Sequence, residues 1–270
     1  MKKIALTVTT ALVLSLTSVN AASLKRGDTA FYSGDYATAR MEWQVLANAG
    51  NATAQFNMGL LYGGGFGVAK DKAQAAQWYR AAAEHGSAEI QRHVAENFRH
   101  GLGVEQSFAE AVTWYRRAAQ RGDITAQKDL GALLYHGVDG AHFYPEALKW
   151  YRMAANQGDA ISQYALGGMA YRGEGVPKDY AQAVTWYRLS AKLGYFGAQN
   201  DLARMYFDGH GVLQDYTTAY MWFSLAKANG SAEATQYMAE TAEMLGSPEI
   251  LTALKMAQDC SGSGYRNCGN

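Results

Sequence analysis

Residues 159–194 carry the sequence DAISQYALGGMAYRGEGVPKDYAQAVTWYRLSAKLG, and this pattern recurs along the chain with a period of 36 residues. Five copies occupy residues 51–86, 87–122, 123–158, 159–194 and 195–230. A fixed period of this size is typical of a solenoid, in which each repeat is one supersecondary unit that stacks on its neighbours. The fold is therefore expected to follow from one repeat and its stacking.

Each copy is predicted to form two helices joined by a glycine-rich loop. Positions 5, 8, 9 and 12 of the repeat are mostly glutamine, apolar, small and apolar, and this spacing places them on one face of a first helix. Glycine can then end that helix in a left-handed conformation, at Gly65, Gly101, Gly137, Gly173 and Gly209. The second helix carries a tryptophan followed by tyrosine or phenylalanine, at Trp78, Trp114, Trp150, Trp186 and Trp222. We expect this tryptophan to be the large side chain that fills each hairpin core.

The second helix is expected to begin at a capping side chain. Asp71, Ser107, Asp179 and Asp215 occupy the N-cap position in four copies. The third copy has Phe143 there and lacks the second glycine of the loop. Its loop is therefore predicted to be the irregular one.

The repeat resembles the Sel-one-like repeat, a relative of the tetratricopeptide repeat. The pattern A-x-x-x-L-G-x-x-Y-x-x-G-x-G-V-x-x-D-x-x-x-A-x-x-W-Y-x-x-A-A-x-x-G covers residues 51–230 in five copies, with half-copies at both ends. The resemblance implies an all-α fold, a right-handed α-solenoid of helix–turn–helix repeats. It also implies a non-catalytic adaptor or scaffold that needs no cofactor and holds a protein or peptide partner in a concave groove lined by the first helices.

Three repeat positions beside the core face of the first helix differ from copy to copy. Positions 6, 10 and 13 share one helical face, and their arginine, tyrosine and phenylalanine residues are types enriched at interfaces. By the resemblance this face is the groove, and the candidate partner-binding residues are Phe56, Arg92, Arg99, Lys128, Tyr135, Tyr164, Tyr171, Asn200, Arg204 and Phe207. The alternative is that aromatic residues such as Tyr135, Tyr171 and Phe207 only pack between repeats.

Residues 1–21 are predicted to be a secretory signal peptide. Two lysines precede an apolar run over residues 4–16, and the Val-Asn-Ala sequence at residues 19–21 suits a small-residue cleavage site. The run is too short to span a bilayer, so no membrane insertion is expected after cleavage. A periplasmic or secreted location is therefore expected, and a buried N-terminal helix is the alternative.

The segments that flank the repeats are expected to cap the solenoid. Residues 22–50 are predicted to form a shortened capping half-repeat, and residues 231–270 to form capping helices and a tail. The chain's two cysteines, Cys260 and Cys268, lie in that tail. An even number of cysteines in an exported chain favours a disulfide, with free thiols or metal binding as the alternatives.

The charge balance and the histidines argue against two classes of partner. Formal net charge is zero, with 24 basic and 24 acidic residues, which does not favour nucleic acid. No H-x-x-x-H pair occurs among the six histidines, and no metal site is predicted from His85, His93, His100, His136, His142 and His210.

Two other functions stay open from the sequence. One is a periplasmic inhibitor of the immunity type, which neutralises a toxin. The other is an enzyme acting on β-lactams or cell-wall material, because Ser224 and Lys227 match the nucleophile motif S-x-x-K. No K-T-G sequence follows, and the other copies have arginine where this copy has Ser224. A chance match is therefore the favoured interpretation.

Overall fold

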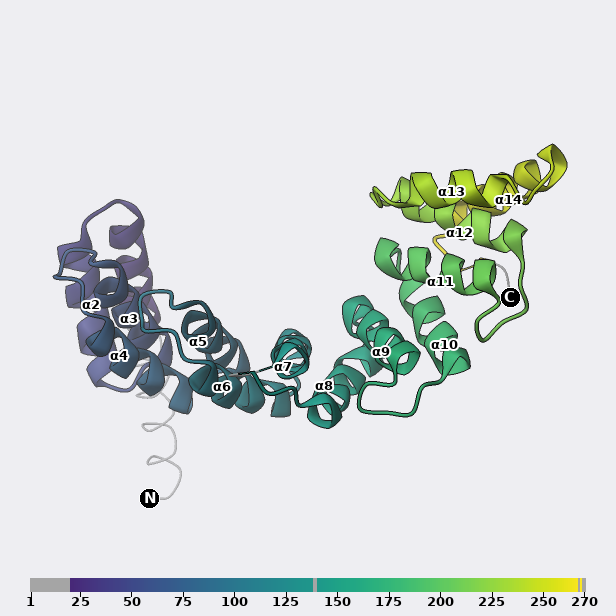
Figure 1. The fold of residues 1–270 in the computed structure, drawn as a ribbon. Coiled ribbons are helices and arrows are strands. Elements are labelled where there is room, and N and C mark those ends of the chain that lie inside the picture. The colour runs from purple at the N-terminus through teal and green to yellow at the C-terminus, as the bar shows by residue number, and fades with distance from the viewer. Residues whose placement is uncertain (1–19, 138–139, 267, 269–270) are drawn as a thin grey trace, which may run out of the picture. The chain divides into compact units, whose positions relative to one another are not determined.

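The computed structural model of the chain describes residues 20–137, 140–266 and 268 (Figure 1). These residues contain a helix over residues 20–32 and then α2 (Tyr36–Asn48), α3 (Ala52–Gly64), α4 (Lys72–His85), α5 (Ala88–His100), α6 (Phe108–Gln120), α7 (Ile124–His136), α8 (Tyr144–Asn156), α9 (Ala160–Arg172), α10 (Tyr180–Ala191), α11 (Phe196–Asp208), α12 (Tyr216–Ala228), α13 (Ala234–Ala242) and α14 (Ser247–Gly262). The prediction of an all-α solenoid of helical repeats is confirmed. Residues 1–19 of the predicted leader lie outside the described residues.

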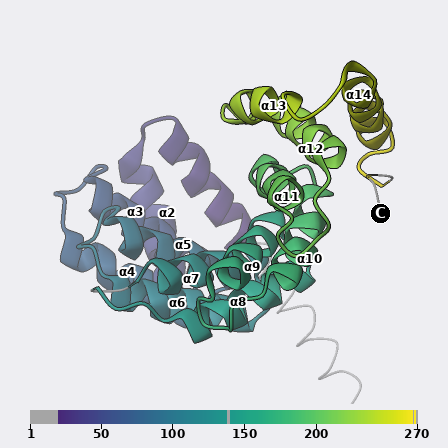
Figure 2. The same cartoon turned by 45° about the vertical axis from the view of Figure 1, so that its right-hand side comes forward.

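The chain divides into two units, Met1–Ala126 and Gln127–Asn270. In the first unit α3 packs on α4 and α5 packs on α6, while α2 contacts α3 and α4 contacts α5. In the second unit α9 packs on α10 and α11 packs on α12, while α8 contacts α9 and α10 contacts α11. Both α13 and α14 pack on α12 at the C-terminal end (Figures 1 and 2). Consecutive helices thus form hairpins that stack on their neighbours.

Glycine and N-cap side chains set the ends of the helices. Gly173 ends α9 with a φ of 76°, and its amide donates a hydrogen bond to the carbonyl of Met169. Asp179 then begins α10 by accepting a hydrogen bond from the amide of Gln182. The first and fifth copies have the same pair of caps, and the second copy has Ser107 in place of the aspartate. In the third copy Phe143 precedes α8 without a side-chain cap, and residues 138–139 of its loop lie outside the described residues.

The hairpin core differs from the prediction in the aromatic residue that fills it. A Cβ atom on Gly59 would lie 2.5 Å from the ring of Tyr79, and one on Gly167 would lie 2.5 Å from the ring of Tyr187. Both tyrosines are buried, whereas the tryptophans that precede them are only partly buried. The tryptophan prediction is wrong for these copies because the next residue lies about 100° further round the helix and faces the small residue of the first helix.

Buried glutamines join consecutive hairpins. Each donates its side-chain amide to the backbone carbonyl eight residues earlier, over distances of 2.9–3.1 Å, as seen for Gln55, Gln91, Gln163 and Gln199. The accepting carbonyls lie in the last turn of the preceding helix, where backbone acceptors lack partners within the helix. This contact explains why glutamine recurs at position 5 of the repeat.

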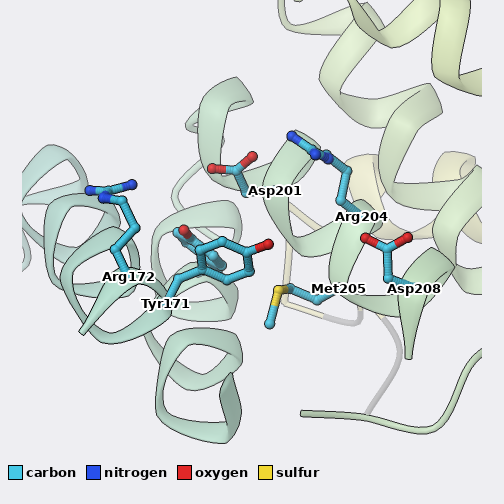
Figure 3. Close-up of a pocket in the computed structure, with 7 residues that line it drawn as sticks. Tyr171, Arg172, Asp201, Arg204, Met205 and Asp208 are labelled. Carbon is cyan, nitrogen blue, oxygen red and sulfur yellow. The ribbon is translucent and has the colours of Figure 1, made fainter. Parts of the chain in front are cut away.

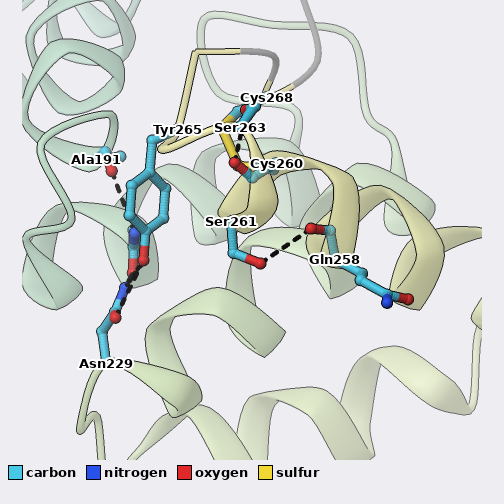
Figure 4. Close-up of a disulfide and its surroundings, with 9 residues drawn as sticks. Ala191, Asn229, Gln258, Cys260, Ser261, Ser263, Tyr265 and Cys268 are labelled. Carbon is cyan, nitrogen blue, oxygen red and sulfur yellow. Dashed lines mark hydrogen bonds between the residues drawn. A yellow bond between two sulfur atoms is a disulfide. The ribbon is translucent and has the colours of Figure 1, made fainter.

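The C-terminal tail is attached to the core of the second unit. A disulfide joins Cys260 of α14 to Cys268, and both residues are buried in that core (Figure 4). The side chain of Asn229 donates to the hydroxyl of Tyr265 at 2.7 Å and to the side-chain oxygen of Gln199 at 2.9 Å. Asn229 therefore connects the tail to the glutamine that links α10 to α11.

Candidate functional site

The second unit has two adjoining pockets on the face of its first helices, here called the α11 pockets. The inner pocket, of about 140 Å³, is lined by Tyr171, Arg172, Tyr187, Asp201, Arg204, Met205 and Asp208 (Figure 3). The outer pocket, of about 160 Å³, is lined by Arg204, Phe207, Asp208, Phe223, Tyr237, Glu240 and Thr241. Arg204 and Asp208 line both, so the two pockets adjoin along α11.

Repeat geometry places these side chains together. Asp201, Arg204, Met205 and Asp208 lie at spacings of three, four and seven residues, so α11 presents them on one face. Helix α9 supplies Tyr171 and Arg172 from its last turn, directly before the capping glycine. From α10 comes Tyr187, whose ring packs over Gly167. The pocket is therefore built on regular helices and on the hairpin core.

The floor of the inner pocket is buried but carries one unused polar group. Tyr187 is 3% exposed and Met205 is 2% exposed. In the part of the chain that the structure describes, no hydrogen bond reaches the hydroxyl of Tyr187. The wall is formed by Tyr171, whose ring centroid lies 5.2 Å from that of Tyr180 in the same hairpin. The pocket thus combines aromatic surface with a hydrogen-bonding group at its base.

The two arginines of the inner pocket have different partners. Arg172 donates from Nε to Glu174 and from Nη2 to the hydroxyl of Tyr135, each at 2.8 Å. The guanidinium of Arg204 is exposed and lies 5.5 Å from the ring centroid of Tyr237. The charge of Arg172 is therefore neutralised locally, while among the described residues Arg204 makes no ion pair within 4 Å.

Asp201 is a carboxylate that lines the inner pocket alone. In the view of Figure 3 it lies between the guanidinium groups of Arg172 and Arg204. Burial raises the pKa of Asp201, and the hydroxyl of Tyr164 together with both arginines partly offsets that rise. No basic group lies within 4 Å of its carboxylate in the described ranges. A partly buried acid without a direct counterion is unfavourable unless something else pairs with it.

The outer pocket has an aromatic base and a charged rim. Phe223 of α12 stacks on Tyr237 of α13, with ring centroids 5.2 Å apart. Phe207 packs against Tyr216 at 5.3 Å. Glu240 is exposed on α13 and accepts a hydrogen bond from Gln236. This pocket has room for a second apolar or aromatic group beside the inner one.

The structure brings four of the predicted groove residues to the α11 pockets. Tyr171, Arg204 and Phe207 line them, and Tyr164 adjoins Asp201. Tyr135 is linked to the rim through its hydroxyl, which donates to Glu174 at 2.8 Å. The aromatic residues among them also pack within their hairpins, so the two interpretations of these positions are compatible.

The other predicted residues, apart from Arg99, have intramolecular side-chain partners. Arg92 forms ion pairs with Glu96 at 2.9 Å and with Asp123 at 3.5 Å, and Lys128 lies 3.5 Å from Asp129. The ring centroid of Phe56 lies 5.2 Å from that of Tyr79, and Arg99 is partly buried. Asn200 is buried, and its side-chain amide donates a hydrogen bond to the hydroxyl of Ser231 at 2.8 Å. Asn200 faces inward because the segment after α12 packs over it.

Sequence reasoning missed Arg172, Tyr187, Asp201 and Asp208. The two aspartates lie three residues before and four residues after Arg204, so helical spacing from that predicted residue could have found them. Tyr187 gave no such signal because the same aromatic position recurs in every repeat as core.

Among the described residues, the S-x-x-K pair is not joined and no metal-binding cluster occurs. The hydroxyl of Ser224 donates to the carbonyl of Tyr220 at 2.8 Å, and no hydrogen bond joins it to Lys227 in the ranges described. Among the same residues no cluster of three or more His, Cys, Asp or Glu side chains could hold a metal ion. Within them, too, no helix has the length and apolar character needed to cross a membrane.

Comparison with known proteins identifies the repeats. The Sel1 repeat family matches residues 52–87, 88–123, 124–159, 160–195 and 197–231. The chain belongs to the Sel1 repeat family, and the resemblance found in the sequence is confirmed. Proteins of this family are helical-repeat scaffolds that are generally non-catalytic and typically mediate protein–protein interaction.

Solved structures agree with this assignment. A protective antigen of uropathogenic Escherichia coli with an SLR fold is 31% identical and superposes with a TM-score of 0.68, covering 91% of this chain. This chain spans only 55% of that antigen. A Sel1 repeat protein from Oxalobacter formigenes is also 31% identical, with a TM-score of 0.66, covering 87% of this chain and 99% of its own length.

More distant similarity carries no functional argument. An immunity protein from Pseudomonas aeruginosa is 16% identical, with a TM-score of 0.39, over 80% of this chain and 84% of its own length. This likeness is too weak to favour the inhibitor alternative. A search of curated proteins found no match.

Proposed function

We propose that this protein is an exported, non-catalytic scaffold that binds a protein or peptide partner on the first-helix face of the unit 127–270. The observation that carries the proposal is the pair of adjoining α11 pockets, which share Arg204 and Asp208. Family membership supports it, since Sel1 repeat proteins typically mediate protein interactions.

Binding by rigid presentation follows from how the pockets are built. Their side chains project from α9, α10, α11, α12 and α13, and the floor residues Tyr187 and Met205 are held by the hairpin core. A preformed surface loses little conformational entropy on association, so more of the contact energy appears as affinity. Tyrosine and arginine are also the residue types that dominate binding energy at interfaces.

Export is the second part of the proposal. It is supported by the apolar leader-like run at residues 4–16 and by the pairing of Cys260 with Cys268. Disulfides persist in oxidising compartments such as the bacterial periplasm and are rare in the cytosol. Fractionation of cells that express the full chain tests this part, with residues 22–270 recovered outside the cytosol as the expected result.

The binding part is tested with two charge-reversed aspartate variants. Residues 22–270 are used to capture partners from the cell envelope, as the native chain, as Asp208→Arg and as Asp259→Arg. Asp208 is exposed and lines both α11 pockets, and Asp259 is an exposed aspartate of α14 outside them that serves as the matched control. We expect a protein recovered by the native chain and by Asp259→Arg to be lost from Asp208→Arg. Equal recovery by all three forms would contradict the proposal.

A further inference from the structure

We infer that the inner α11 pocket receives a lysine or arginine side chain of the partner. This inference rests on the proposed function and specifies it, because it names the chemical group that enters the pocket. The geometry of Asp201, Tyr171 and Tyr187 carries it, together with the balance of charges around them.

The pocket has the size and the surface that a single basic side chain needs. Its volume of about 140 Å³ suits one side chain, since a cavity of roughly 150 Å³ holds a molecule as large as benzene. The rings of Tyr171 and Tyr187 line it, and the buried Met205 completes the floor. The alkyl stem of a lysine or arginine side chain can pack on these rings. A cation near an aromatic face gains further attraction.

Two groups in the pocket can accept a further hydrogen bond. The hydroxyl of Tyr187, on a residue 3% exposed, has no hydrogen-bond partner within the described chain. The carboxylate of Asp201 interacts with the hydroxyl of Tyr164. The partly buried carboxylate of Asp201 has no basic group within 4 Å in the same ranges. An ammonium or guanidinium group would donate to both and would supply the counterion that Asp201 lacks.

The charges around the pocket favour a cation over an anion. Glu174 neutralises Arg172 at 2.8 Å, which leaves Arg204 as the remaining basic group of the pocket lining. The pockets also contain three acidic residues, which are Asp201 and Asp208 in the inner pocket and Glu240 in the outer one. The ring nitrogen of His210 is 3.9 Å from Asp208 and carries charge only when protonated. An incoming carboxylate would therefore meet more negative than positive charge.

Saturation-transfer NMR with small probes tests the inference on residues 22–270. The cationic probes are Nα-acetyl-lysine amide and Nα-acetyl-arginine amide. Their neutral counterparts are Nα-acetyl-norleucine amide and Nα-acetyl-citrulline amide, and Nα-acetyl-glutamate amide is the anionic probe. We expect saturable transfer to both cationic probes, with dissociation constants on the order of 1 mM for ligands of this size. The other three probes should show at least tenfold weaker binding.

Carboxamide variants locate the binding site. Asp201→Asn keeps the side-chain shape and should weaken the cationic probes at least tenfold, because it removes a partly buried charge partner. Asp208 lies on the exposed rim, so Asp208→Asn should not disturb folding. This variant should weaken binding of the cationic probes about twofold to fivefold. Asp259→Asn changes an exposed carboxylate of α14 and should leave binding unchanged. Thermal melting verifies that each variant is folded.

Three results would overturn the inference. They are absence of transfer to both cationic probes, stronger transfer to the glutamate probe, and undiminished binding in both Asp201→Asn and Asp208→Asn. The scaffold proposal fails on a different result, which is retention of the captured partner by Asp208→Arg. A chain that loses its partner in Asp208→Arg but does not bind the cationic probes would refute only the inference of a basic side chain in the inner pocket.

Discussion

Tyr79 of α4 and Tyr187 of α10 occupy the same repeat position three copies apart, yet their surroundings differ. Beside Tyr79, Gly63 stands where Tyr171 stands beside Tyr187, and a Cβ atom on Gly63 would lie 2.8 Å from the Cα atom of Gly103 in the next loop. Beside Tyr187 the ring of Tyr171 occupies that place and faces the inner pocket. The same hairpin core therefore supports a close loop contact in one unit and a pocket in the other.

The charged positions differ in the same way. His93 and Glu96 stand in the first unit where Asp201 and Arg204 stand in the second, and the imidazole of His93 lies 3.1 Å from the carboxylate of Glu96. Glu96 also pairs with Arg92 one helical turn earlier. These polar groups of the first unit are thus paired within the chain, whereas Asp201 and Arg204 have no ion-pair partner within 4 Å among the described residues. On the proposed function, the variable positions rather than the repeat core would decide which unit binds a partner.

The largest expected effect tests whether the two cores are equivalent. Tyr79→Ala and Tyr187→Ala should each lower the free energy of unfolding by about 3–5 kcal/mol, because each removes a buried aromatic side chain packed over a glycine. Chemical denaturation followed by circular dichroism measures the loss. A loss below about 1 kcal/mol for either variant would show that its tyrosine is not the core residue of its hairpin.

The next effect should be confined to the second unit. Replacing Cys260 and Cys268 together with serine removes the disulfide that closes the tail, and the short loop predicts a loss of roughly 2–3 kcal/mol. Hydrogen exchange should then quicken in α12 and α14 and stay unchanged in α3 and α4. Equally faster hydrogen exchange in both units would mean that the disulfide does not stabilise the second unit alone.

A smaller difference in stability is expected between alanine variants of two arginines, Arg92 and Arg204. Arg92→Ala should lower the free energy of unfolding by about 1 kcal/mol or less, because its half-buried guanidinium pairs with Glu96 and Asp123. Arg204→Ala should leave stability within about 0.5 kcal/mol of the native chain, as for other surface changes. Thermal melting of both variants measures the difference. A reversed order would contradict the structural role of Arg92.

The smallest effect is a pH dependence with a defined sign. Burial raises the pKa of Asp201 in the folded chain, against the opposing effects of Tyr164, Arg172 and Arg204 and with a further rise from Glu233. Ionising Asp201 therefore costs stability as the pH rises through the folded pKa, and this cost is absent at pH values below the unfolded pKa. Asp201→Asn should match the native chain at acid pH and be slightly more stable at neutral pH. Denaturation at a series of pH values measures the difference in free energy of unfolding between Asp201→Asn and the native chain. If Asp201→Asn lost stability relative to the native chain with rising pH, the raised pKa of Asp201 would be refuted.

Much of the architecture was predictable because it depends on residues that recur. Glycine at the end of the first helix and aspartate at the start of the second act through local backbone geometry, and both caps are found where the sequence places them. In the first and fourth copies the buried aromatic is the tyrosine after the predicted tryptophan, because the two neighbours differ by a turn of about 100° around the helix. In the other copies Trp114, Trp150 and Trp222 are buried as predicted.

The pocket was less predictable because it depends on contacts between copies. Arg92 and Arg204 are both arginines on the first-helix face, and the sequence does not show that Asp123 pairs with one while the other stays unpaired among the described residues. Asn200 likewise appeared as a groove residue, whereas Ser231 of the following segment covers it. Such pairings follow from packing in three dimensions.

The central comparison is tested most directly by methionine methyl NMR on residues 22–270. Met205 lies on the floor of the inner pocket, and Met58 is a buried methionine of α3 in the other unit. Single substitutions with leucine assign the two methyl signals. Titration with Nα-acetyl-lysine amide should shift the Met205 signal in a saturable way, leave Met58 unmoved, and shift neither signal in Asp201→Asn. Equal shifts at both methionines, or a fixed Met205 signal in the native chain, would contradict the assignment of binding to the second unit.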